Sequence, residues 1–167
     1  MSYQSVFRSD LFTNKVVLVT GGGSGIGRCT AHELASLGAR VILAGRRQDA
    51  LDAVAAEIIE DGGAADTAAM DIRDENLVRA SVARIVASHG PVHGLVNNAG
   101  GQFPSPLANI SAKGFRAVVD TNLTGGFLVA REVFNQSMKE SGGAIVNITA
   151  DCHNGMPMMG HSGAARS

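Results

Sequence analysis

Residues 16–20, Val-Val-Leu-Val-Thr, form a strand-like run that leads into a glycine-rich turn, and a helical pattern follows at once. Glycines let the backbone turn tightly and approach a pyrophosphate, whose negative charge the free N–H groups of a helix start stabilise. This strand–turn–helix context is the one that the chemistry requires, so the segment predicts a nucleotide site. A purely structural tight turn is the alternative. The predicted contacts are Gly21, Ser24, Gly25, Ile26 and Gly27.

The rest of the chain alternates strand and helix patterns, which predicts an α/β fold with a doubly wound parallel sheet and right-handed crossovers. Helices are expected on both faces of this sheet, because the strands read as continuous apolar runs. The predicted strands span 15–20, 41–44, 65–70, 94–97 and 144–149. The predicted helices span 25–37, 49–60, 75–88 and 111–139, the last with Ser111 as its N-cap.

A second motif lies at residues 95–100, Leu-Val-Asn-Asn-Ala-Gly, where another strand ends in a turn of small residues. In the first motif, three residues separate Gly21 from Gly25, and Thr20 precedes them. Together the two motifs resemble the short-chain dehydrogenase/reductase family, from about Asp10 to the end of the chain. The resemblance implies a Rossmann-type fold that binds a nicotinamide cofactor. It also places small side chains of the second motif along that cofactor, namely Asn98, Ala99 and Gly100.

The sequence is expected to form a single dinucleotide-binding domain over residues 1–167. The doubly wound order of such folds has six strands, whereas the pattern here supplies five. We therefore expect the Rossmann-type sheet to be incomplete, with the C-terminal part of the domain missing.

Charge and composition restrict the partners. The chain has 14 basic and 15 acidic residues, which indicates neither a nucleic-acid nor an anionic membrane surface. No apolar run reaches the length of a membrane span, the start lacks a signal-peptide pattern, and two distant cysteines give no disulfide framework. A cytoplasmic location is expected. Cys29 reads as a small core residue, and the spacing of Cys152, His153 and His161 fits no common metal site.

The cofactor is predicted to be NADPH. Strand two ends without the acidic residue that accepts a hydrogen bond from an unphosphorylated ribose. It ends instead at Arg46 and Arg47, and a guanidinium can bind a 2′-phosphate through two hydrogen bonds. By resemblance Arg46 is the phosphate ligand, while Arg47 assists it or faces water; the alternative is that both face water.

The adenine side is assigned by resemblance to Asp71 and Ile72. The carboxylate of Asp71 would accept from the exocyclic amine, and Ile72 would cover the ring. The alternative role for Asp71 is to cap the helix that follows. Arg73 and Asp74 are predicted to be surface residues.

Catalysis is where the chain departs from the family. Most members carry a serine after strand five and a Tyr-x-x-x-Lys pair in the next helix, with an asparagine in the long helix completing a proton relay. Asn122 matches that asparagine, but Ala150 stands at the serine position. Ser162 and Arg166 replace the tyrosine and the lysine, and the only tyrosine of the chain is Tyr3.

The residues around these replacements resemble the peroxisomal-type trans-2-enoyl-CoA reductases and their relatives, the 2,4-dienoyl-CoA reductases. The resemblance rests on segments 98–103, 121–125 and 155–166. Reduction of a conjugated C=C leaves an enolate on the thioester oxygen, which needs hydrogen-bond donors more than a tuned phenol. Ser162, Arg166 and Thr149 are the candidate donors. His161 is an alternative acid, or a histidine with a structural hydrogen bond.

The sequence thus predicts an NADPH-dependent enoyl-thioester reductase acting on an acyl-CoA. A carbonyl or alcohol dehydrogenase for a small or terpenoid substrate, and a catalytically silent cofactor-binding protein, are the alternatives. By resemblance a homodimer or homotetramer is expected, with the helix over 111–139 packing against its copy. Apolar residues at helical spacing would form the contact, although some could face the sheet instead. They are Phe115, Val118, Val119 and Leu123.

Overall fold

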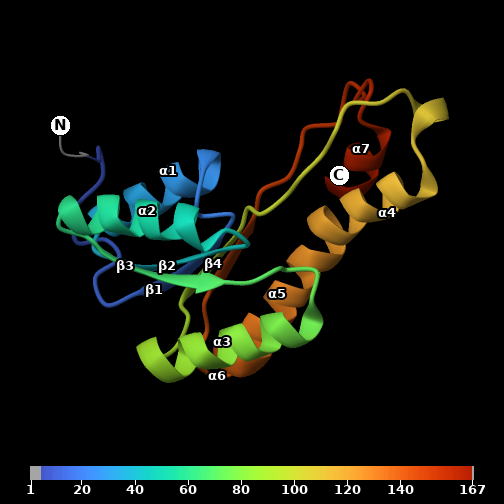
Figure 1. Ribbon diagram of the computed structural model, residues 1–167. Coiled ribbons are helices and arrows are strands. Elements are labelled where there is room, and N and C mark those ends of the chain that lie inside the picture. The colour runs from blue at the N-terminus through green and yellow to red at the C-terminus, as the bar shows by residue number, and fades with distance from the viewer. Residues whose placement is uncertain (1–4, 167) are drawn as a thin grey trace.

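Five parallel strands form one sheet in the computed structural model, which describes residues 5–166 (Figure 1). The strands are β1 (Val16–Thr20), β2 (Arg40–Gly45), β3 (Ala64–Ala69), β4 (Gly94–Asn97) and β5 (Ala144–Asn147). Their order is β3-β2-β1-β4-β5, so the chain reverses direction across the sheet between β1 and β4. A crevice at such a switch point is where open α/β sheets bind ligands. The predicted α/β class is confirmed, and the boundaries of the predicted elements differ by at most two residues.

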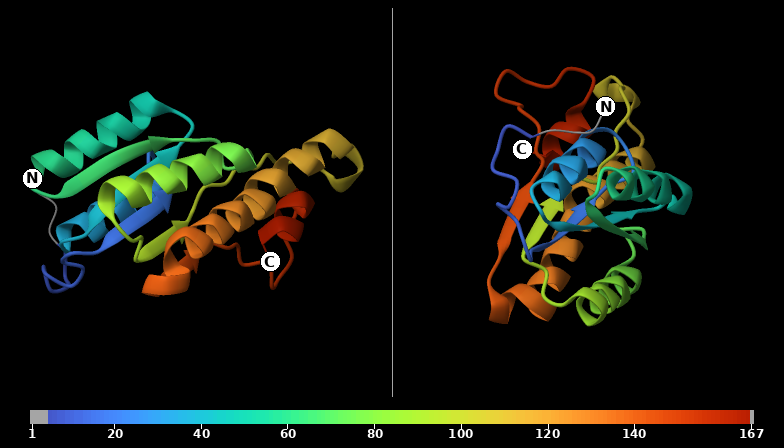
Figure 2. Two further views of the ribbon diagram at one scale, coloured as in Figure 1. Left: turned by 90° about the horizontal axis from the view of Figure 1, so that it is seen from below. Right: turned by 90° about the vertical axis from the view of Figure 1, so that its left-hand side faces the viewer.

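Helices cover both faces of the sheet, as Figures 1 and 2 show. On one face lie α1 (Gly25–Ser36) and α2 (Gln48–Glu60), and on the other lie α3 (Glu75–His89) and the long helical segment after residue 111. Alternate residues of β1 explain this arrangement, because Val17 and Val19 join the core under α1 and α2. Val16 and Leu18 point the other way and join the core under α3 and α5.

The long helix runs from Ala112 to Ser141 in five consecutive pieces without a break. Two π-helical turns interrupt its α-helical geometry. The pieces are α4 (Ala112–Val119), η2 (Asp120–Thr124), α5 (Gly125–Val133), η3 (Phe134–Met138) and α6 (Lys139–Ser141). The predicted cap is confirmed, since the Ser111 hydroxyl accepts from the Gly114 N–H at 3.0 Å. A short 3-10 turn (η1, Leu107–Asn109) precedes the helix, and α7 (Gly160–Arg166) follows β5.

The structure corrects two sequence interpretations. Cys29 is exposed on α1 rather than part of the core. Asp71 does not cap α3, because that position belongs to Asp74, whose carboxylate accepts from the Leu77 N–H at 3.0 Å. Asp74 is exposed, as predicted, and its capping role is one that the sequence did not indicate.

The residues of the long helix that were assigned to a subunit contact differ in their exposure to solvent. Val118 is 3% exposed and faces the interior, whereas Phe115 and Leu123 are 41% and 53% exposed. Phe127 and Phe134 add further exposed aromatic surface along the same helix. The expected dimer or tetramer stays a prediction. Within residues 5–166, no helix combines the length and apolar character needed to cross a bilayer.

His93 joins three strands at the start of β4. Its backbone N–H donates to the Val16 carbonyl at 2.8 Å, and its own carbonyl accepts from Ala144 N–H at 3.0 Å. Its Nδ1 accepts from the Val16 N–H at 3.1 Å, which requires a neutral imidazole. Burial, with a smaller contribution from the Lys15 cation, lowers the pKa of His93 below its ordinary 6.5.

We therefore predict an acid-sensitive contribution of His93 to stability. As pH falls below about 6.5, the unfolded chain binds a proton before the folded one does, so the free energy of unfolding decreases until the lowered folded pKa is passed. His93→Asn keeps an acceptor near the Nδ1 position but does not titrate, and it should flatten this dependence. His93→Ala should cost roughly 0.5–1.5 kcal/mol at pH 8, the worth of one hydrogen bond.

Urea unfolding between pH 8 and pH 5 measures both effects in the purified full-length protein. His153→Asn is the matched control, because His153 is exposed and outside the sheet. An unchanged pH dependence in His93→Asn, or an equal change in the control, would contradict the assignment.

Candidate functional site

The glycine-rich turn adopts a conformation that larger residues resist. Gly21 and Gly25 have φ values of +68° and +53°, in the left-handed region that glycine enters without a steric penalty. A Cβ at Gly27 would collide with the Gly21 carbonyl oxygen, and one at Gly21 would lie 2.8 Å from the Asn98 amide nitrogen. The turn is therefore a shallow cradle of bare backbone at the start of α1, which fits a pyrophosphate.

The side chain of Thr20 ties this turn to the second motif. Its hydroxyl accepts from the N–H groups of Asn98 and Ala99 at 3.1 and 3.0 Å, and it lies 3.3 Å from the Val96 carbonyl. The Asn98 amide in turn donates to the Thr20 carbonyl at 3.0 Å. Asn98 thus holds two turns together at the switch point.

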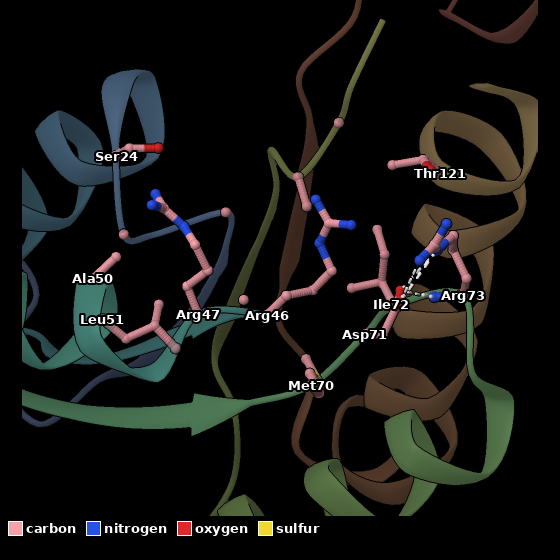
Figure 3. Close-up of a pocket in the computed structure, with 15 residues that line it drawn as sticks. Ser24, Arg46, Arg47, Ala50, Leu51, Met70, Asp71, Ile72, Arg73 and Thr121 are labelled. Carbon is pink, nitrogen blue, oxygen red and sulfur yellow. Dashed lines mark hydrogen bonds and ion pairs between the residues drawn. The ribbon is translucent and has the colours of Figure 1, made fainter. Parts of the chain in front are cut away.

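A first pocket opens over these turns at the carboxyl ends of β1, β2 and β3 (Figure 3). It contains most of the predicted cofactor residues, while Gly25, Ile26, Gly27 and Asn98 lie outside its lining. In Figure 3 the guanidinium of Arg47 extends toward Ser24, and that of Arg46 extends toward Ile72. The predicted residues in the lining are Gly21, Ser24, Arg46, Asp71, Ile72, Ala99 and Gly100.

Arg73 is exposed, as predicted, and it also lines the first pocket. Its Nε lies 3.0 and 3.1 Å from the two carboxylate oxygens of Asp71, and its terminal nitrogen donates at 2.5 Å. These bonds, with a smaller effect of Arg46, lower the pKa of the Asp71 carboxyl. The Asp-x-Arg spacing was the available signal, since it lets a side chain fold back two residues. Thr121 of η2 completes this side of the pocket.

A second pocket lies between α5, the carboxyl ends of β4 and β5, and α7, and it contains Asn122, Thr149 and Arg166. The Nε of Arg166 donates to the Asn122 amide oxygen at 2.7 Å, and one terminal nitrogen donates to the Ile148 carbonyl at 2.9 Å. Burial lowers the pKa of Arg166, yet a guanidinium remains charged under all ordinary conditions. The site therefore contains one fixed cation.

Both the amide nitrogen and the amide oxygen of Asn122 have hydrogen-bond partners, which fix the side chain that orients this cation. Its amide nitrogen donates to the carbonyls of Gly101 and Val118 at 2.7 and 2.8 Å. Its amide oxygen accepts from the Gly101 N–H at 3.2 Å as well as from Arg166. Asn122 sits in the π-helical turn η2, and such turns are frequent at functional sites.

Ser162 and His161 occupy different surroundings from those expected. Both are 0% exposed in the first turn of α7, and neither the Ser162 hydroxyl nor the imidazole nitrogens have a hydrogen-bond partner. The His161 ring meets the ring of Phe103 edge-on, with centroids 4.5 Å apart. Ser162 is in the lining of neither pocket, so Arg166 and Thr149 are the predicted donors that reach one.

Tyr3, the single tyrosine of the sequence, lies outside the described residues. Among residues 5–166, no three His, Cys, Asp or Glu side chains gather closely enough to bind a metal ion.

Residues 15–166 match the family model described as short chain dehydrogenase, and the chain belongs to that family. One solved structure that the chain resembles, described below, contains NADPH. Its curated relatives include the peroxisomal 2,4-dienoyl-CoA reductase of Danio rerio, 30% identical over 99% of this chain and 56% of that protein. The glucose 1-dehydrogenase of Gluconobacter oxydans is 36% identical over 95% of this chain and 60% of that protein. The chain thus spans little more than half the length of these relatives.

Solved structures agree closely with the fold. The citronellol catabolism dehydrogenase AtuB of Pseudomonas aeruginosa PAO1 is 62% identical, with a TM-score of 0.95 over 98% of this chain and 67% of that one. An F189W actinorhodin polyketide ketoreductase with NADPH is 37% identical, with a TM-score of 0.88 over 91% of this chain and 59% of that one.

We predict that Gly100→Ala displaces the Arg166 guanidinium. A Cβ at Gly100 would overlap a terminal nitrogen of Arg166, whereas a Cβ at Gly101 would meet nothing within 4 Å. Misplacing a catalytic cation by about 1 Å can cost on the order of 100-fold in rate. In the full-length protein, kcat/KM for the reaction proposed below should fall on that scale in Gly100→Ala. It should stay within about threefold of the parent value in the control Gly101→Ala. Equal losses in both variants, or none in Gly100→Ala, would contradict the prediction.

Proposed function

We propose that the protein reduces the conjugated C=C of an enoyl thioester, with NADPH as the hydride donor and an acyl-CoA as the substrate class. The observation that carries this proposal is the fixed Arg166 cation at the family's lysine position, without a tyrosine among the described residues 5–166. The similarity to 2,4-dienoyl-CoA reductases at about 30% identity supports the same chemistry.

The chemistry of this reduction explains why a cation can serve in place of a tyrosine. The nicotinamide supplies a hydride to the β-carbon when it is bound. Negative charge then develops on the thioester oxygen, where a preorganised donor stabilises it strongly. Uptake of a proton from solvent at the α-carbon completes the reduction. Arg166 uses its Nε and one terminal nitrogen on Asn122 and Ile148, so its other terminal nitrogen, beside Gly100, is the one that faces this oxygen.

Thr149 is the second donor that we propose. It follows the end of β5, is exposed, and lines the same pocket as Arg166. Ser162 is fully buried and lines neither pocket, so this proposal gives its hydroxyl no contact with the substrate.

A carbonyl or alcohol dehydrogenase for an acyclic terpenoid is the second candidate. It is favoured by the 62% identity to a protein described as a citronellol catabolism dehydrogenase. The same similarity also fits a branched, terpenoid acyl chain on the enoyl thioester, so the two candidates differ in the bond reduced rather than in the carbon skeleton.

The assay that separates the two follows NADPH oxidation by the full-length protein with crotonyl-CoA, geranyl-CoA or citronellal, and NADP⁺ reduction with citronellol. We expect turnover with at least one of the thioesters and loss of the conjugated double bond in the product. Turnover with citronellal or citronellol alone would favour the dehydrogenase. Binding of NADPH without turnover of any compound would favour a catalytically silent protein.

For the cofactor we propose a preference for NADPH through Arg46, with Asp71 accepting from the adenine amine. Arg46→Asp replaces an attractive contact with a repulsion, and charged hydrogen bonds are worth roughly 1.5–3 kcal/mol. NADPH affinity should therefore fall about 10- to 100-fold, while NADH affinity changes little. Fluorescence titration of both cofactors measures this, with the exposed Arg84→Asp as the control. Equal affinity of the parent protein for both cofactors would refute the assignment.

A further inference from the structure

We propose that Arg73 is a positioning residue that orients the Asp71 carboxylate, so that the first pocket accepts adenine and rejects purines with a carbonyl at the same position. This inference rests on the nucleotide pocket of the proposed function. It does not depend on which bond of the substrate is reduced.

Arg73 restrains the carboxylate from two sides. Its backbone N–H donates to one oxygen of Asp71 at 3.0 Å, and its guanidinium contacts both oxygens. The two groups come from one residue, so the carboxylate cannot rotate without losing either the backbone bond or the planar side-chain pair. Free rotation of the Asp71 carboxylate is therefore suppressed before a ligand arrives.

The loop around the pair is itself fixed. The Asp74 N–H donates to the Asp71 carbonyl at 3.1 Å, and the Asp74 side chain caps α3. Acidic Asp120 stands near Arg73, and basic Arg46 acts on the Asp71 carboxylate. Asp71 is thus flanked by two cations, which keep it ionised and able only to accept hydrogen bonds.

The remaining acceptor capacity belongs to the pocket. A carboxylate has about four lone-pair sites, and the contacts with Arg73 use most of them. The Asp71 side chain is still 30% exposed and lines the first pocket, as Figure 3 shows. A ligand group that meets it must therefore donate, as an exocyclic amine does. A carbonyl oxygen there would face a negative charge without a hydrogen between them.

The test compares NADPH with its deaminated analogue, nicotinamide hypoxanthine dinucleotide phosphate, which carries a carbonyl in place of the adenine amine. Titrations with the full-length protein should show that the parent favours NADPH by about tenfold or more, the scale of one unmade hydrogen bond to a charged group. Arg73→Ala should reduce this preference to within about threefold. Arg73→Lys, which retains the charge and one donor, should be intermediate.

Two further variants sharpen the result. Asp71→Asn can donate to a carbonyl, so it should weaken or reverse the preference for adenine. Arg79→Ala removes the same charge from exposed surface on α3 and should leave the preference unchanged.

An Arg73→Ala protein that keeps the full preference, or that loses affinity for both purines equally, would overturn the proposal. So would a parent that binds both purines equally. Failure of the substrate assay, by contrast, leaves these binding ratios measurable. If the parent protein does not bind NADPH at all, both the proposed cofactor and this inference are refuted.

Discussion

The hydroxyl of Thr20 is the contact on which the rest of the site depends. It lies where β1 and β4 end side by side, and it accepts two backbone N–H groups from the turn that follows β4. Parallel strands at a switch point send their following segments to opposite faces of the sheet, so the two turns would otherwise separate. A buried hydroxyl with this many partners is costly to replace, because each unpaired N–H would carry its full desolvation penalty.

Both pockets follow from that junction. The glycine-rich turn leads into α1 on one side and forms the floor of the first pocket. On the other side, the turn after β4 ends at Gly101, which exchanges hydrogen bonds with the side-chain amide of Asn122. The same amide accepts a hydrogen bond from Arg166. Substitution of lysine by arginine at this last position is not conservative, because a planar guanidinium can bind two acceptors in fixed directions at once. The neighbouring glycine accommodates the larger group.

Local pattern was sufficient for the sheet, the helices and the glycine-rich turn, because each is determined by residues close together in the chain. The apolar runs of β1 and β2 are buried on both faces, and the cap at Ser111 lies within residues 111–114. Side-chain partners were harder to predict. Ser162 is enclosed and Cys29 is exposed, and both depend on how segments pack in space. The contact of Arg73 with Asp71 is local, two residues apart, and the Asp-x-Arg spacing was its only signal. The roles of Arg46, Asn122 and Arg166 came from resemblance, and they remain proposals.

The π-helical turn at Asn122 divides one helix into two surfaces with different tasks. Such a turn contains one residue more than an α-helical turn, and each residue in a helix advances the surface by about 100°. The extra residue lets α4 present its side chains to α7 in one phase, while α5 presents Val129 and Val133 to the sheet in another. Deleting a single residue here would restore a regular helix and rotate one half against the other. The chain length of this turn is therefore as much a part of the site's specification as the identity of its residues.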